Sequence, residues 1–129
     1  MSEIALDTNT YSALTGGNAH IEDLLQSAER VVFPFIVVGE LLSGFRNGTR
    51  EKRNREQLFQ LLDSNTSEII YADMQTAEYY ASIFADLRRK GRTIPTNDIW
   101  IAAIALQHEL PLCTFDSHFD YVDGLTIIR

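Results

Sequence analysis

The sequence predicts a single-domain α/β fold, residues 1–129, in which a five-stranded parallel sheet is sandwiched between helices. Two observations carry this prediction. The length of 129 residues is typical of one domain. Short apolar runs alternate along the chain with longer segments whose apolar residues recur at helical spacing. Strands that alternate with helices form parallel sheets that helices cover on both faces.

The expected elements follow one another closely along the chain. In order they are a strand at 4–6, helices at 10–14 and 21–28, a strand at 31–33, helices at 34–45 and 49–63, a strand at 69–71, helices at 74–90 and 97–108, and strands at 111–114 and 126–128. Each strand is a short, mostly apolar run, and each helix has apolar residues three or four positions apart.

The helix ends are placed by residues that favour caps and turns. Pro34 suits the first turn of its helix, and Asn47 with Gly48 breaks that helix. Asp73 is a favourable N-cap for the long helix that follows, and Gly91 suits its C-terminal stop.

Composition predicts the compartment. A single cysteine, Cys113, excludes an intrachain disulfide and fits a reducing cytosol; we expect it to be a small core residue. The first nine residues lack the basic and apolar regions of a signal peptide. The longest apolar run, 31–38, is far shorter than the roughly 20 residues that cross a bilayer. We expect a cytoplasmic protein with no membrane segment.

The charge distribution is uneven. A formal net charge of −7 argues against binding to nucleic acid when it is taken alone. However, most of the 11 Lys and Arg residues fall in two segments, 46–55 and 88–92. Two compact basic segments can bind a polyanion locally on an acidic protein. The alternative is two solvated faces in which Glu51 and Glu56 pair with nearby arginines.

Two acids directly follow expected strands. Asp7 comes after the first strand and Asp116 after the fourth. Ligand sites in parallel sheets lie beyond the carboxyl ends of the strands, so both acids are placed for a site. Each taken alone could equally be a loop or N-cap residue.

Two further acids lie in apolar helices. Glu40 is surrounded in sequence by the apolar residues of segment 35–42, where an unpaired carboxylate costs several kcal/mol. It could instead occupy a narrow solvent stripe or pair with an arginine. Asp98 opens an apolar helix, where it could serve only as a cap.

The four acids together indicate a site for a hard cation. Carboxylate oxygens select ions such as Mg²⁺ or Mn²⁺, and Mg²⁺ usually acts with phosphate substrates. The chain has no glycine-rich phosphate loop and no nucleophile elbow. Its histidines show no metal-ligand spacing, and we expect surface or capping roles for His20, His108 and His118.

Short motifs in a specific order resemble those of the PIN-domain family, and more narrowly the ribonuclease toxins of VapBC-type toxin–antitoxin pairs. The matching motifs are LDTN at 6–9, GELLSG at 39–44, PTNDIWIAA at 95–103, TFDSHF at 114–119 and GL at 124–125. Together they span essentially the whole chain. The resemblance implies a PIN-like five-stranded parallel sheet.

The resemblance also implies a metal-dependent endoribonuclease that cleaves tRNA or rRNA. It implies that Mg²⁺ or Mn²⁺ is held by Asp7, Glu40, Asp98 and Asp116, with polar support from Thr114 and Asn9. The implied partners are a second copy of the chain and a small antitoxin that also binds DNA, which together form a higher assembly.

Two surfaces are predicted for these partners. We expect RNA phosphates to contact the basic segments through Arg46, Arg50, Arg53, Arg88, Arg89 and Arg92. We expect the dimer interface to use part of an aromatic set, because aromatic residues are enriched in interface cores. That set is Tyr79, Tyr80, Phe84 and Trp100, whose helical spacing fits a core role equally well.

Two other functions compete with a nuclease. A phosphatase with Asp7 as covalent nucleophile would need a second Asp two residues later, but position 9 is Asn. A non-catalytic PIN-like module could bind RNA or protein, although such a module would have no reason to keep all four acids.

Overall fold

The computed structural model describes residues 3–129, so the first two residues of the predicted domain lie outside the described residues. Its strands are β1 (Glu3–Leu6), β2 (Arg30–Pro34), β3 (Ser67–Ile70), β4 (Leu112–Cys113) and β5 (Ile127–Ile128). They form one sheet in the order β3-β2-β1-β4-β5, and every neighbouring pair is parallel. The predicted five-stranded parallel sheet is confirmed.

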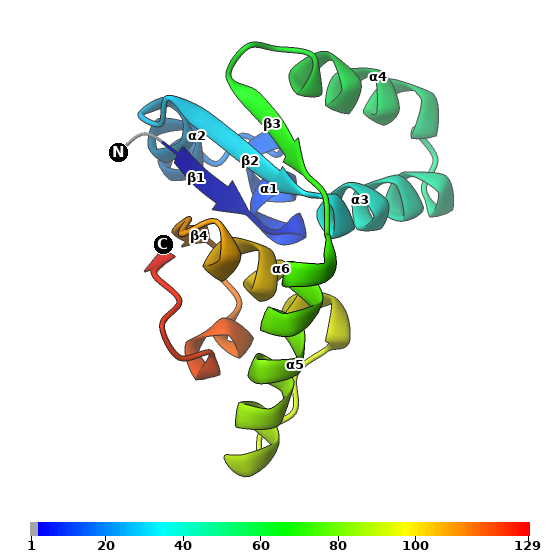
Figure 1. The fold of residues 1–129 in the computed structure, drawn as a ribbon. Coiled ribbons are helices and arrows are strands. Elements are labelled where there is room, and N and C mark those ends of the chain that lie inside the picture. The colour runs from blue at the N-terminus through cyan, green and yellow to red at the C-terminus, as the bar shows by residue number, and fades with distance from the viewer. Residues whose placement is uncertain (1–2) are drawn as a thin grey trace.

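Helices connect the strands and cover the sheet (Figure 1). They are α1 (Thr8–Thr15), α2 (Ala19–Gln26), α3 (Phe35–Asn47), α4 (Glu51–Leu62), α5 (Met74–Arg89) and α6 (Thr96–Gln107), with a short 3-10 helix, η1 (Ser117–Tyr121). In Figure 1, α1 and α2 lie behind β1 and β2, while α5 and α6 lie side by side below them. No helix within residues 3–129 has the length and apolar character to cross a membrane.

The apolar runs of the sequence become the core. β1 and β2 contribute fully buried residues such as Leu6 and Phe33. Helix α6 is buried on nearly every side, from Ile99 to Ala105, as its continuous apolar sequence predicts. η1 is anchored by Phe119, whose side chain is fully buried.

The start of α6 differs from the prediction. The helix begins at Thr96 with Pro95 as its N-cap, and no side chain caps it. The predicted start was Asn97 or Asp98. Proline fits because its fixed φ suits a helix start and its missing N–H has no helical partner there. Asp98 therefore lies inside the first turn, and its carboxylate is free for another role.

The strand order places a switch point beside β1. The chain builds the sheet outward from β1 through β2 to β3, and then returns to the other side of β1 with β4. Ala5 and Leu6 of β1 align with Leu112 and Cys113 of β4. Ligands bind at the carboxyl ends of the strands at such a point.

Candidate metal centre

Asp7 and Thr114 leave the sheet together at the switch point. Asp7 caps α1, and its Oδ1 accepts the backbone N–H of Thr10 at 2.9 Å. Its Oδ2 accepts the hydroxyl of Thr114 at 2.5 Å. Both residues are almost fully buried, with 4% and 1% of their surface exposed. Asp7 is therefore held rigidly at the end of β1.

The cysteine on β4 lies beside this pair without taking part in it. The backbone carbonyl of Cys113 accepts the Thr10 hydroxyl at 2.8 Å, and its thiol is buried. Burial, assisted by the charge of Asp7, raises the pKa of the Cys113 thiol to about 11. The thiol stays protonated at neutral pH, as expected for a core residue rather than a nucleophile.

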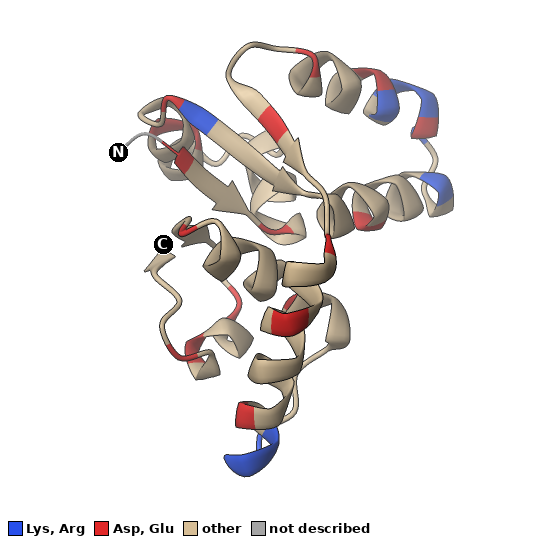
Figure 2. Cartoon of the chain, viewed as in Figure 1, with Lys and Arg blue, Asp and Glu red and all other residues tan. Residues whose placement is uncertain are grey.

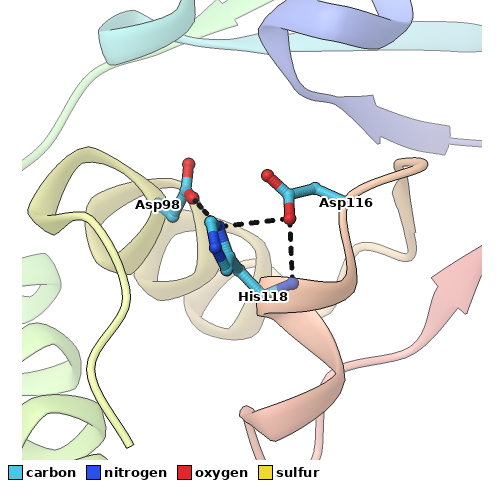
Figure 3. A group of neighbouring side chains, drawn as sticks. All are labelled: Asp98, Asp116 and His118. Carbon is cyan, nitrogen blue, oxygen red and sulfur yellow. Dashed lines mark hydrogen bonds and ion pairs between the residues drawn. The ribbon is translucent and has the colours of Figure 1, made fainter.

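Asp98 and Asp116 meet at the imidazole of His118 (Figure 3). The Nδ1 atom of His118 lies 3.1 Å from Asp98 Oδ2 and 3.1 Å from Asp116 Oδ1. Asp116 is the N-cap of η1, and its Oδ1 also accepts the His118 backbone N–H at 2.9 Å. One ligand atom from each of the three residues lies within 4.8 Å of the other two. Asp98 and His118 are 20 residues apart in the sequence, and the packing of η1 against α6 brings them together.

Glu40 approaches the same edge from α3. Its Oε1 accepts the hydroxyl of Thr8 at 2.7 Å, and its Oε2 accepts the side-chain amide of Asn97 at 3.3 Å. Thr8 follows Asp7 in sequence, and Asn97 precedes Asp98. Glu40 thus contacts the side chains of two residues that neighbour Asp7 and Asp98 in the sequence.

The carboxylates form one connected group. Thr114 joins Asp7 to Asp116, because its oxygen also accepts the Asp116 backbone N–H at 2.9 Å. Burial raises the pKa of Asp98, the His118 hydrogen bond lowers it, and the charges of Asp116 and Glu40 raise it further. Within residues 3–129, no lysine or arginine forms an ion pair with any of these acids. The group is a negative site that a cation would stabilise.

A family model for the PIN domain matches residues 4–125. This chain belongs to the PIN-domain family. The match begins within β1, includes β2, β3 and β4, and contains all four predicted acids.

Curated relatives of this PIN domain align over nearly its whole length. Ribonuclease VapC5 of Mycobacterium tuberculosis is 29% identical, with 96% of this chain and 90% of the relative covered. Plasmid stability protein StbB of Pseudomonas syringae pv. tomato is 33% identical, with 98% and 96% covered.

Solved structures share the fold. VapBC from Salmonella typhimurium, solved bound to DNA, contains a chain 26% identical to this PIN domain with a TM-score of 0.88, and 99% and 98% of the two chains are covered. VapBC-1 from nontypeable Haemophilus influenzae gives 25% identity and a TM-score of 0.87, with 98% and 97% covered.

The donor set of this PIN domain fits a divalent cation. Carboxylate oxygens and one imidazole nitrogen converge from α6 and from the start of η1, and the nearby acids Asp7, after β1, and Glu40, on α3, add negative charge. Hard dications are bound by such oxygen donors. Asp98, Asp116 and His118 lie closest together. Thr114 connects Asp7 to the backbone of Asp116, and Glu40 accepts a hydrogen bond from Asn97, the residue before Asp98.

Two residues that the sequence analysis did not assign to the site contact the acidic group. Asn9 is exposed, and its neighbour Thr8 makes the contact to the acidic group instead. His118 was expected on the surface or in a cap, and its side chain is 43% exposed, but its imidazole also lies between Asp98 and Asp116. The only signal for His118 in the sequence was its position two residues after Asp116, which is too common to indicate a ligand.

The two basic segments lie at opposite ends of the molecule (Figure 2). Some of their charges have local partners: Arg46 pairs with Glu51 at 3.3 Å, as the solvated-face alternative predicted. Lys90 pairs with Asp86 at 2.8 Å and Asp123 at 2.7 Å. The guanidinium of Arg92 lies 4.5 Å from the ring centre of Tyr121. Part of segment 88–92 therefore packs against η1.

Proposed function

We propose that this PIN domain is a Mg²⁺- or Mn²⁺-dependent endoribonuclease and the toxin of a toxin–antitoxin pair. The observation that carries the proposal is the linked group of Asp7, Glu40, Asp98 and Asp116 at the switch point of the sheet, without a lysine or arginine partner in the described chain. Relatives named ribonuclease and solved VapBC complexes support the activity and the partner.

The chain's own residues position the reacting groups. Thr10 and Thr114 orient Asp7, Thr8 and Asn97 orient Glu40, and η1 holds Asp116 against Asp98. A bound divalent ion would lower the pKa of a ligated water and neutralise charge on the scissile phosphate. These hydrogen bonds hold the acids in place before substrate arrives, so little reorganisation is needed.

We propose tRNA or rRNA as the substrate, a cognate antitoxin and a second copy of the chain as partners, and the cytoplasm as the location.

The dimer would use the exposed side of α5, where Phe84 is 42% exposed. Tyr80 is half-buried and stacks on Trp100 with ring centres 4.1 Å apart, so these two rings also support the fold. Light scattering at micromolar concentration tests the dimer; a monomer would contradict it.

The test of the activity compares matched carboxylate variants. Purified wild type should cleave a tRNA or rRNA preparation when Mn²⁺ or Mg²⁺ is present, and EDTA should stop it. Asp7→Asn and Asp98→Asn should lower cleavage by at least about a hundredfold, because each removes one negative ligand. Asp63→Asn, an exposed acid at the end of α4, should cleave like wild type.

Growth provides the second readout. Expression of the wild-type gene alone should slow growth, and expression of Asp98→Asn should not. Unchanged cleavage by Asp98→Asn would show that Asp98 is only a residue of the helix start. RNA binding without cleavage by the wild type, with metal present, would favour a non-catalytic PIN module.

A further inference from the structure

The imidazole of His118 occupies an unusual position for a hydrogen-bonding residue. Its Nδ1 lies at the same distance, 3.1 Å, from one oxygen of Asp98 and one oxygen of Asp116. A ring nitrogen carries at most one hydrogen, so it can donate fully to only one of two acceptors. A hydrogen on Nδ1 can therefore account for only one of the two short contacts.

A shared cation accounts for both distances. Ligands bonded at about 2.1 Å and at right angles around one ion are about 3.0 Å apart, because they span the diagonal of a square with that side. The two N–O separations match this spacing. One ligand atom from each of the three side chains lies within 4.8 Å of the other two, so the three side chains are close together at one place.

The fold, rather than the ring itself, sets this position. The backbone N–H of His118 donates to Asp116 Oδ1 at 2.9 Å, which fixes the first turn of η1. Phe119 is fully buried and anchors the same turn in the core. The far end of η1 is held by Lys90, whose Nζ donates to the Tyr121 carbonyl at 3.0 Å. The nitrogen is thus preorganised beside the two acids.

We propose that His118 is a nitrogen ligand of the metal site and that it makes the site prefer a first-row transition-metal dication such as Mn²⁺ to Mg²⁺. The inference rests on the proposed metal site at Asp98 and Asp116. Mg²⁺ is bound mainly by oxygen donors and water, whereas imidazole suits transition-metal ions. Four carboxylates alone would not discriminate in this way; His118 adds the selective donor.

The test uses the metals alone, without RNA. Affinities for Mn²⁺ and for Mg²⁺ are measured by calorimetry on wild type, His118→Asn and His20→Asn. Asparagine keeps a polar side chain of similar reach but offers amide oxygen in place of imidazole nitrogen. His20 is exposed on α2, so its variant is the matched control. We expect His118→Asn to lose at least about tenfold in Mn²⁺ affinity, to change much less in Mg²⁺ affinity, and His20→Asn to match wild type.

Electron spin-echo spectroscopy of bound Mn²⁺ gives a direct readout of the ligand. Wild type and His20→Asn should show nitrogen coupling from a coordinated imidazole, and His118→Asn should not. If His118→Asn fails to fold by circular dichroism, the wild-type spectrum still decides. Bound Mn²⁺ without nitrogen coupling, or an unchanged Mn²⁺ to Mg²⁺ preference in His118→Asn, overturns the inference.

The result separates this inference from the proposed function. Nitrogen-free Mn²⁺ binding together with Asp98-dependent RNA cleavage would remove His118 as a ligand and leave the nuclease standing. Absence of binding by either metal, together with absence of cleavage, would overturn both.

Discussion

At the scale of single residues, Thr114 connects two acids through one hydroxyl group. The hydroxyl donates to Asp7 and accepts the backbone N–H of Asp116, and the residue is 1% exposed. Without it, the buried carboxylate of Asp7 and the partly buried N–H of Asp116 would both lose a partner. Thr114 therefore orients the acids while carrying no charge of its own.

Replacing Thr114 tests this role. Thr114→Val keeps the shape of the side chain and removes the oxygen. We expect the free energy of unfolding to fall by about 1–3 kcal/mol, since buried polar groups lose their partner. RNA cleavage should fall roughly 10- to 100-fold, as for lost supporting residues of metal sites. Urea unfolding and cleavage rates measure these effects, and Thr126→Val, at an exposed position before β5, is the control. Wild-type behaviour of Thr114→Val would show that Asp7 needs no support.

Asp98 makes stability depend on pH when metal is removed. Its pKa is raised, with burial as the largest cause, so the folded protein loses stability as pH rises through that pKa. Asp98→Asn cannot ionise. We expect the EDTA-treated variant to be more stable than wild type at pH 7, and this difference to vanish as pH falls to about 3.9, the ordinary value for Asp. Urea unfolding at several pH values measures it. A less stable variant at pH 7 would show that the His118 contact outweighs the burial of charge.

At the scale of elements, η1 links the acidic site to the end of α5. Asp116 and His118 lie at its start, while its end is bound by Lys90 through the Tyr121 carbonyl and Asp123. The hydrogen bond to Asp123 is the largest cause that raises the pKa of Lys90. A lysine predicted to lie in an RNA-binding segment therefore also positions the helix that carries two site residues.

Lys90→Met should loosen η1 without unfolding the domain. We expect a drop in Mn²⁺ affinity smaller than about tenfold, because Lys90 acts through the helix and not on the ion. Calorimetry measures the affinity. Arg89→Met is the matched control, since Arg89 pairs only with Asp86, at 3.3 Å, among the described residues. Equal affinities in the two variants would assign Lys90 to the surface alone.

At the scale of the whole molecule, the acidic group should couple metal binding to stability. An ion that binds only the folded state adds about 2.7 kcal/mol at a hundredfold excess over its dissociation constant. For a domain of this size we expect the melting temperature to rise on the order of 10 °C. Thermal unfolding with EDTA and then with Mn²⁺ measures the rise. The double variant Asp98→Asn, Asp116→Asn should show none, and an unchanged wild-type melting temperature would contradict the metal site.

The separation of the basic segments allows the RNA path to be mapped. Two triple variants change the net charge equally at opposite ends of the molecule. One replaces Arg88, Arg89 and Arg92 with Glu, and the other replaces Arg46, Arg50 and Arg53 with Glu. In an Asp7→Asn background, each lost phosphate contact should flatten the salt dependence of binding by roughly 0.7 log units per log unit of salt. The end that contacts RNA should show the larger loss. Equal affinity and slope in both variants and the parent would place RNA elsewhere.

The sequence by itself determined the order of strands and helices and the residues that end them. The spacing of apolar residues and the presence of cap residues are signals within a short stretch of sequence, so β1, α5 and the buried helix α6 could be predicted. The same signals marked Asp7 and Asp116 at strand ends and Glu40 in an apolar helix. Pro95 displaced the expected start of α6, because competing cap residues stand within three positions of one another.

Only the tertiary structure decided which side chains meet. Asp98 and His118 are separated by 20 residues, and their contact depends on how η1 packs against α6. Thr8 rather than Asn9 contacts Glu40, because the first turn of α1 directs adjacent side chains to different faces. Local sequence reports periodicity and burial. Distances between ligand atoms depend on strand register and helix packing, which join parts of the chain that are far apart in sequence.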